Sequence, residues 1–213
     1  MKLESGIVKF NQTFSLKSPL EYDIIGELNI WRDTLYRSRL IGQDESRYGG
    51  YGYGNISQKL SSCYFLKNKN KFVITGTQTG GLPELTESHY TTVLEYYPKK
   101  NLVIVEGPVK ASSESMTHGS IYDLDDEINF VFHAHSPEIW KSSKKLDIPI
   151  TNENIEYGTP EMAEEVNRLF KETNVKDKKI FSMGGHEDGV ITFGSNSYEA
   201  GGAMLYYLSK VSG

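Results

Sequence analysis

Apolar residues recur at three- and four-residue spacing near the start of the chain. Between residues 20 and 42, five of them fall on one face of a helix: Leu20, Ile24, Leu28, Trp31 and Leu35. Polar and charged residues fill the positions between them. We therefore expect an amphipathic helix here, ended by Gly42.

Shorter apolar runs then predict strands separated by turns. Residues 61–66 (SSCYFL) and 71–75 (KFVIT) flank a turn rich in lysine and asparagine. Residues 91–107 (TTVLEYYPKKNLVIVEG) predict an antiparallel hairpin. INFVFHAH at 128–135 predicts a strand, and KIFSMGGHEDGVITFG at 179–194 predicts a strand, a turn and a strand. The glycine-rich RYGGYGYGNIS, which starts at Arg47, is expected to be irregular.

Three later segments carry helical patterns. SSESMTHGSIYDL (112–124) has Ser112 or Ser113 as its N-cap, and TPEMAEEVNRLFKET (159–173) has Thr159 as cap. SYEAGGAMLYYLSK (197–210) is the last helix. Their expected core positions are Met162, Val166, Leu169, Phe170, Ala200, Met204 and Leu208. Mixed hairpins and helices predict an α/β fold of three layers with a largely antiparallel sheet, in a single domain over residues 1–213.

Composition narrows the functional classes. The 213 residues are 38% hydrophobic and carry a net charge of −5, so no large basic surface for nucleic acid or anionic lipid is expected. The short lysine runs predict solvated loops. No apolar run reaches the roughly 18 residues of a membrane span, and we expect a cytoplasmic protein. Cys63 is the sole cysteine, which excludes an internal disulfide and a cysteine-cluster zinc site.

Two histidines lie two residues apart at the end of a predicted strand. Side chains at i and i+2 of a strand share a face, so His133 and His135 would stand about 7 Å apart, close enough for two nitrogens to reach one ion. Val131 shares that face, whereas Phe132 and Ala134 line the other. The alternative is a pair of buried, hydrogen-bonded histidines. We favour the metal site, which requires a third ligand.

His186 is the candidate third ligand, because it lies in a glycine-rich turn that can aim its side chain freely. Alone, such a histidine is more often a surface residue. Glu114 and His118 are four apart on one helix face; beside a metal, Glu114 could act as a general base. His118 could then orient Glu114 or add a ligand. His89 has no companion and is interpreted as structural.

Small-residue loops offer hydroxyls and amides for a phosphate group. They are GYGNIS (52–57), GTQTGG (76–81) and the SSE at 112–114, which opens a helix. None matches a P-loop or a GxGxxG motif, and each taken alone is more simply a turn. No Gly-x-Ser-x-Gly elbow is present, so covalent nucleophilic catalysis is not expected.

Taken in order, these segments resemble the class II aldolase/adducin family from about Leu28 to Lys210. The resemblance rests on YGNIS, ITGTQTG, SSESMTH, INFVFHAHSP, YGTPEMAEEV and GGHEDGVITFG. It implies an α/β/α sandwich around a mainly antiparallel sheet, and commonly a homotetramer with the active site at a subunit interface. It also implies a divalent, zinc-type ion on His133, His135 and His186, with Glu114 as acid/base. The implied phosphate-binding residues are Gly54, Asn55, Thr79, Gly80, Ser112 and Ser113.

The activity implied is that of a metal-dependent lyase of the aldolase type on a small phosphorylated ketose. The cation would act as a Lewis acid and stabilise an enediolate, while Glu114 moves the proton at the neighbouring carbon. Alternatives are dehydration or epimerisation of a similar sugar phosphate, a hydroxy-acid substrate without phosphate, or a non-catalytic binding module like the adducins.

Three features depart from the family pattern. The stretch between HAHSP and YGTPE is short, and no residue in it can be matched to the catalytic tyrosine or aspartate that family enzymes place there. Glu187 and Asp188 separate His186 from the next glycine, which adds two carboxylates near the expected site. GTQTG is two residues longer than the family's usual Thr-x-x-Gly turn. The difference falls at Thr79 and Gly80, two of the implied phosphate-binding residues.

Overall fold

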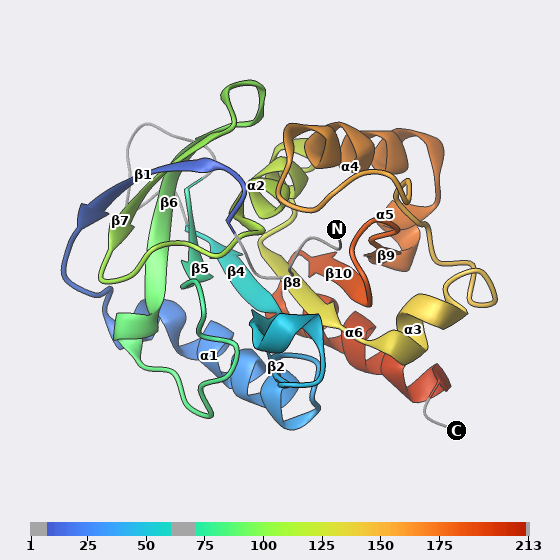
Figure 1. Ribbon diagram of the computed structural model, residues 1–213, viewed down its shortest axis with the longest axis horizontal. Helices are drawn as coiled ribbons and strands as arrows, with labels where there is room; N and C mark the ends of the chain where they lie inside the picture. Colours follow the sequence, from blue (N-terminus) through green and yellow to red (C-terminus); the bar gives the residue numbers. More distant parts are fainter. Residues whose placement is uncertain (1–7, 61–70, 212–213) are drawn as a thin grey trace.

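The computed structural model describes residues 8–60 and 71–211. Its centre is an eight-stranded sheet in the order β1-β7-β6-β5-β4-β8-β10-β9 (Figure 1). Among the strand pairs of the described residues, only β1–β7 is parallel, so the sheet is mainly antiparallel, as predicted. The strands are β1 (Asn11–Leu16), β4 (Asn55–Lys59), β5 (Phe72–Thr75), β6 (Tyr90–Tyr97), β7 (Leu102–Gly107), β8 (Phe130–His135), β9 (Ile180–Ser182) and β10 (Gly189–Gly194).

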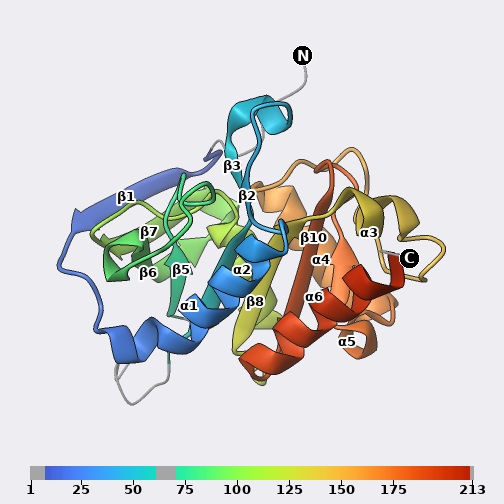
Figure 2. The same ribbon diagram turned by 90° about the horizontal axis from the view of Figure 1, so that it is seen from below.

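Helices cover both faces of this sheet (Figure 2). α2 and α4 bury one face of the sheet with a core that includes Val131, and α1, α3 and α6 bury the other with a core that includes Phe132 and Ala134. The alternation of side chains predicted for the strand β8 is therefore confirmed, and so is the three-layer architecture. The helices are α1 (Tyr22–Arg37), α2 (Ser115–Leu124), α3 (Pro137–Ser142), α4 (Pro160–Glu172), α5 (Val175–Lys178) and α6 (Ser197–Val211).

The described segments agree with most sequence expectations. The 91–107 hairpin is β6 and β7, KFVIT contains β5, and the 179–194 segment is β9, a turn and β10. Thr159 caps α4 by accepting a hydrogen bond from the Met162 amide at 3.3 Å. Met162, Val166, Leu169, Phe170, Ala200 and Met204 are buried, and Leu208 packs against the core. The strand expected at 61–66, with Cys63, lies outside the described residues.

Three local expectations were wrong: the helix stop at Gly42, the irregular conformation of the segment from Arg47, which contains β3 and the start of β4, and the serine cap of α2. α1 ends at Arg37, and Arg39, not Gly42, takes the left-handed conformation after it, with φ of 58°. Gly42 instead begins β2 (Gly42–Gln43), which pairs with β3 (Gly52–Tyr53) in a small hairpin that holds the turn η1 (Tyr48–Gly50). α2 begins after Glu114, and neither of the two expected serines caps it by its side chain.

Two short helical turns complete the description, η2 (Glu87–His89) and η3 (Pro98–Lys100). In η2, the Thr86 amide donates to His89 Nδ1 at 2.9 Å, so His89 is structural, as predicted. Within the described residues, no helix has the length and apolar character needed to cross a bilayer.

Candidate metal centre

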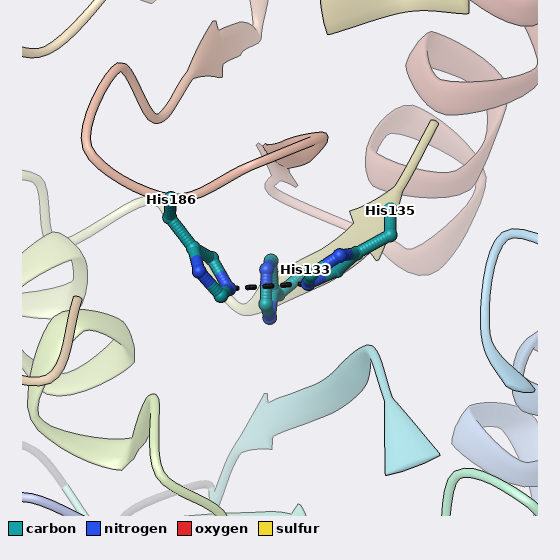
Figure 3. Close-up of side chains that lie close together, drawn as sticks. All are labelled: His133, His135 and His186. Carbon is teal, nitrogen blue, oxygen red and sulfur yellow. Dashed lines mark hydrogen bonds between the residues drawn. The ribbon is translucent and has the colours of Figure 1, made fainter. Parts of the chain in front are cut away.

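Three histidines from two separate segments meet beside the end of β8. His133 and His135 are cross-strand neighbours of Ile191 and Gly189 on β10, and His186 lies in the turn between β9 and β10. His135 Nε2 lies 3.1 Å from His186 Nε2 (Figure 3). One ring nitrogen of each histidine lies within 4.8 Å of those of the other two. The predicted trio is therefore brought together, at separations that one bound ion could bridge.

All three imidazoles are buried and uncharged. Burial lowers the pKa of His133 to about 3, and lowers the pKa of His135 and His186 well below the usual value. The mutual repulsion of their charged forms adds to the shift for His135 and His186. Neutral imidazole is the form that ligates a metal, so protons do not compete for these nitrogens near neutral pH.

Asn55, at the start of β4, faces His133 directly across the sheet. Its Nδ2 is 3.2 Å from His133 Nδ1, while its Oδ1 and His133 Nε2 are buried without a hydrogen-bond partner in the described part of the chain. Exchanging the amide nitrogen and oxygen of Asn55 gives Oδ1 a partner, because Oδ1 then accepts from Nδ1–H of His133. This leaves the Nε2 lone pair of His133 available to a cation, which is how metal-bound histidines are commonly oriented.

His186 is packed by residues that the sequence did not mark as functional. The Tyr157 ring lies over His186 with centroids 4.3 Å apart, and Lys9 Nζ lies 3.9 Å from the Tyr157 centroid. Lys9 also pairs with Glu156 at 2.9 Å. A segment near the N-terminus thus places a positive charge next to the centre. Tyr157 lies in the YGTPE motif, which was its only signal; Lys9 had none.

A pocket connects the histidines to the predicted phosphate-binding loops. The residues that line it include all three histidines and all six phosphate candidates, which are Gly54, Asn55, Thr79, Gly80, Ser112 and Ser113. Gly54 has φ of 78°, and a Cβ there would lie 2.6 Å from Ile41 Cγ1. A Cβ on Gly80 would lie 2.8 Å from the Tyr53 amide nitrogen. Both positions therefore require glycine to keep backbone groups close to the pocket.

Glu114 follows the two serines of the pocket but does not itself line it. Its Oε2 accepts a 2.8 Å hydrogen bond from Thr117, whereas Oε1 is buried without a hydrogen-bond partner among the described residues. Burial raises the pKa of Glu114 to about 7, against the lowering effects of Thr117 and of the Lys9 charge. A carboxyl group with this pKa can both take and give a proton near neutral pH.

His118 is one turn along α2 from Glu114 but is not part of the histidine cluster. Its Nδ1 lies 2.7 Å from Ser57 Oγ, which also lies 2.7 Å from the Tyr122 hydroxyl. Burial lowers the pKa of His118 well below the usual value. Of the two roles considered for His118, this arrangement disfavours that of a further ligand.

Comparison with known proteins agrees with this fold. The sequence pattern of one family, described as "Class II Aldolase and Adducin N-terminal domain", matches residues 38–209 of this chain. A search of curated proteins found no match.

Similar solved structures include an L-fuculose 1-phosphate aldolase, at TM-score 0.62 and 19% identity over 90% of this chain and 88% of that one. An L-fuculose-1-phosphate aldolase from Thermus thermophilus has a TM-score of 0.60 at 19% identity, over 90% and 91% of the two chains. YgbL from Escherichia coli, a putative aldolase/epimerase/decarboxylase, has a TM-score of 0.61 at 15% identity, over 89% of this chain and 86% of that one. At these identities the likeness concerns the fold, and with the sequence match it leads to one conclusion: the chain belongs to the class II aldolase and adducin N-terminal domain family.

Proposed function

We propose that this protein is a metal-dependent lyase of the aldolase type that acts on a small phosphorylated ketose. The observation that carries the proposal is the position of three neutral histidines in the same pocket as a cradle of backbone amides and the Ser113 hydroxyl. A binding module without catalysis has no need for this combination. The proposal includes a homo-oligomeric, tetrameric assembly, as the resemblance to the family implies.

The residues fit a divalent cation of the zinc type. Three imidazole nitrogens are the ligand set of many catalytic zinc sites, which leave a further position for substrate. His133 Nε2 has no hydrogen-bond partner among the described residues, although it is buried, and a cation would satisfy it. His133, His135 and His186 would hold the ion, which would polarise a substrate carbonyl as a Lewis acid.

Glu114 would move the proton at the carbon next to that carbonyl. Its Oε1, which has no hydrogen-bond partner in the part of the chain that is described, is the atom available for the transfer, because Oε2 accepts from Thr117. The Thr117 contact orients the carboxyl group, and burial keeps its pKa near the working pH. Bulk water would have little access to this group, which is 1% exposed.

The cradle would bind the phosphate and so position the carbon skeleton. Its donors are backbone amides and the Ser113 hydroxyl, and no lysine or arginine lines the pocket within the described residues. Amides near the start of α2 favour an anion through their orientation. Binding energy from the phosphate would hold the reacting carbons in place.

Dehydration or epimerisation of a similar sugar phosphate is the second candidate reaction. It would use the same cation and the same carboxyl group, since each begins by moving a proton beside a carbonyl. Two observations favour considering this second reaction. The stretch between HAHSP and YGTPE is short, and the fold is similar to that of a putative aldolase/epimerase/decarboxylase.

The test combines metal content with an activity panel. Protein purified with zinc is assayed against phosphorylated ketoses, with triose phosphate release as the signature of cleavage. His133→Ala should lose the metal, and Glu114→Gln should keep the metal but lose at least about 100-fold in kcat. His89→Ala is the control, because that histidine only stabilises a turn.

Three results would contradict the proposal. They are wild-type protein that binds no divalent ion, full metal content in His133→Ala, and full activity in Glu114→Gln. Product analysis separates the reactions, because isomerised or dehydrated product without triose phosphate would favour the second candidate.

A further inference from the structure

His135 differs from the other two histidines of the cluster in how it is oriented. Its Nε2 faces His186, but its Nδ1 is buried without a hydrogen-bond partner among the described residues. Metal-bound histidines usually donate the second ring N–H to an acceptor, which fixes the ring. For His135, some other contact must do this.

Two tyrosine rings make that contact. The Tyr48 ring meets His135 nearly edge-on, with centroids 4.5 Å apart at 70°, and the Tyr53 ring lies 5.4 Å away. The two tyrosines also pack against each other at 5.2 Å. Aromatic packing therefore limits the rotation of the His135 ring.

Tyr48 reaches His135 from the tip of the β2–β3 hairpin, which projects from the body of the molecule (Figure 2). Its φ of 51° lies in the left-handed region, which a bulky residue rarely adopts, and Gly49 and Gly50 follow with φ of 67° and 78°. An outlier of this kind persists only where neighbouring contacts impose it. The RYGG sequence thus builds a turn whose tip carries one aromatic ring back onto the centre.

Asp188 supplies the contact that holds the tip in place. Its Oδ2 accepts from the Tyr48 hydroxyl at 2.7 Å and from Arg47 Nη2 at 3.1 Å. Its backbone oxygen accepts from the Ser136 amide at 2.9 Å, just after His135. Asp188 has φ of 63° and lies two residues after His186. Asp188 therefore joins the hairpin through its carboxylate and the end of β8 through its backbone oxygen, and it lies in the turn that carries the third histidine.

We propose that Tyr48 and Asp188 are positioning residues of the metal centre, in which Asp188 holds the Tyr48 ring against His135 and so fixes this ligand for the ion. The inference rests on the proposed function for the presence of a cation. It adds a part that belongs to this chain: a hairpin that takes the place of the usual hydrogen bond to a ligating histidine.

The test measures Zn2+ affinity by chelator competition and the visible absorption spectrum of the Co2+-substituted protein. Tyr48→Leu removes the ring, and Zn2+ should bind about 10- to 100-fold more weakly. Tyr48→Phe keeps the ring but removes its hydrogen bond to Asp188, and Asp188→Gly removes the carboxylate at a φ that glycine tolerates. For both variants we expect a smaller loss of Zn2+ affinity, about 3- to 10-fold. Asp188→Asn keeps an acceptor and tolerates this φ, and should restore near-native affinity.

Ser46→Ala is the matched control in the same hairpin, because among the described residues Ser46 makes side-chain hydrogen bonds only with Asp44. Support requires the graded loss of affinity, a changed Co2+ spectrum in Tyr48→Leu, rescue by Asp188→Asn and no change in the control. Wild-type affinity and spectrum in Tyr48→Phe and Asp188→Gly would overturn the inference, and these two decide it if Tyr48→Leu does not fold. An equal loss in Ser46→Ala would also overturn it.

If wild-type protein binds neither ion, the proposed function fails as well. If wild-type protein binds both ions and the variants match it, only this inference fails.

Discussion

At the scale of single residues, the two serines before α2 have different tasks. The Ser112 hydroxyl already donates to the carbonyls of Thr75 at 2.6 Å and Gly76 at 3.2 Å. The Ser113 hydroxyl has no hydrogen-bond partner in the described part of the chain, and it lines the pocket. Ser113 can therefore donate to a phosphate oxygen, while Ser112 offers its amide.

Ser113→Ala should weaken the binding of inorganic phosphate about 10-fold, because it removes a hydrogen bond to a charged group. Ser112→Ala should change this affinity by less than about 3-fold, and instead lower the free energy of unfolding by about 1 kcal/mol. Calorimetric titration and urea denaturation measure the two effects. A larger loss of phosphate affinity in Ser112→Ala than in Ser113→Ala would contradict this division.

The raised pKa of Glu114 has a consequence for stability in the metal-free protein. The folded-state pKa of about 7 exceeds the unfolded value of about 4.5, so the folded state holds its proton more tightly. Below about pH 4.5 the carboxyl group is neutral in both states and carries no cost. As pH rises from 4.5 to above 7, burial of the charge destabilises the fold, by about 3 kcal/mol at most.

Glu114→Gln removes this group's titration and keeps its size. With a chelator present, we expect the variant to be about as stable as wild type at pH 4.5 and more stable by about 2–3 kcal/mol at pH 8. Urea denaturation at both pH values measures the difference. The comparison isolates Glu114, because the buried histidines destabilise both proteins equally as pH falls through about 6.5. A difference that does not change with pH would contradict the raised pKa.

How much of the site could be predicted depends on distance along the chain. His133 and His135 follow from the strand period, and the loops follow from their small residues. Lys9 approaches Glu156 across 147 positions, and Tyr48 approaches Asp188 across 140. No local pattern encodes such contacts, because they form only when the sheet brings the segments together.

At the scale of elements, the strand β1 and the helix α3 were not predicted, each for a physical reason. β1 pairs in parallel with β7, about 90 residues later, and most of its side chains are exposed or half-buried, so it has no apolar run. α3 is six residues long, too short for a helical period to be recognised. The amphipathic α4 and the fully buried β8 were predictable because burial imposes a pattern on each.

The packing of α1 against α6 is decided at one glycine. A Cβ on Gly201 would lie 2.2 Å from the ring of Trp31, which is itself packed against Phe132 at 6.0 Å and Tyr198 at 5.8 Å. A Cβ on Gly202 would meet nothing within 4 Å. Gly201 and Gly202 are adjacent in α6, but a side chain would meet the Trp31 ring at Gly201 and open space at Gly202.

Gly201→Ala should lower the free energy of unfolding by about 1–2 kcal/mol, since the cost of overpacking exceeds the gain in helix propensity. Gly202→Ala should raise it by up to about 1 kcal/mol through propensity alone. Thermal and urea denaturation of the pair measures both signs. Stabilisation by both substitutions would mean that Trp31 moves aside without cost.

At the scale of the whole molecule, the candidate centre exists only in the folded chain. Its parts come from the N-terminal segment, the β2–β3 hairpin, the start of α2, the end of β8 and the turn after β9. The unfolded chain cannot gather these groups. Binding of an ion to the folded state therefore adds to the free energy of folding.

Zinc should accordingly stabilise the protein by an amount set by its free concentration. At 100 times the Kd, the gain is about 2.7 kcal/mol, which for a chain of this size raises Tm by about 5–11 °C. Scanning calorimetry in buffered zinc and in chelator measures the shift. His186→Ala should lose most of it, and His89→Ala should keep it, because His89 lies in a turn outside the cluster. An equal shift in both variants would place the ion elsewhere on the molecule, since only one of them removes a residue of the histidine cluster.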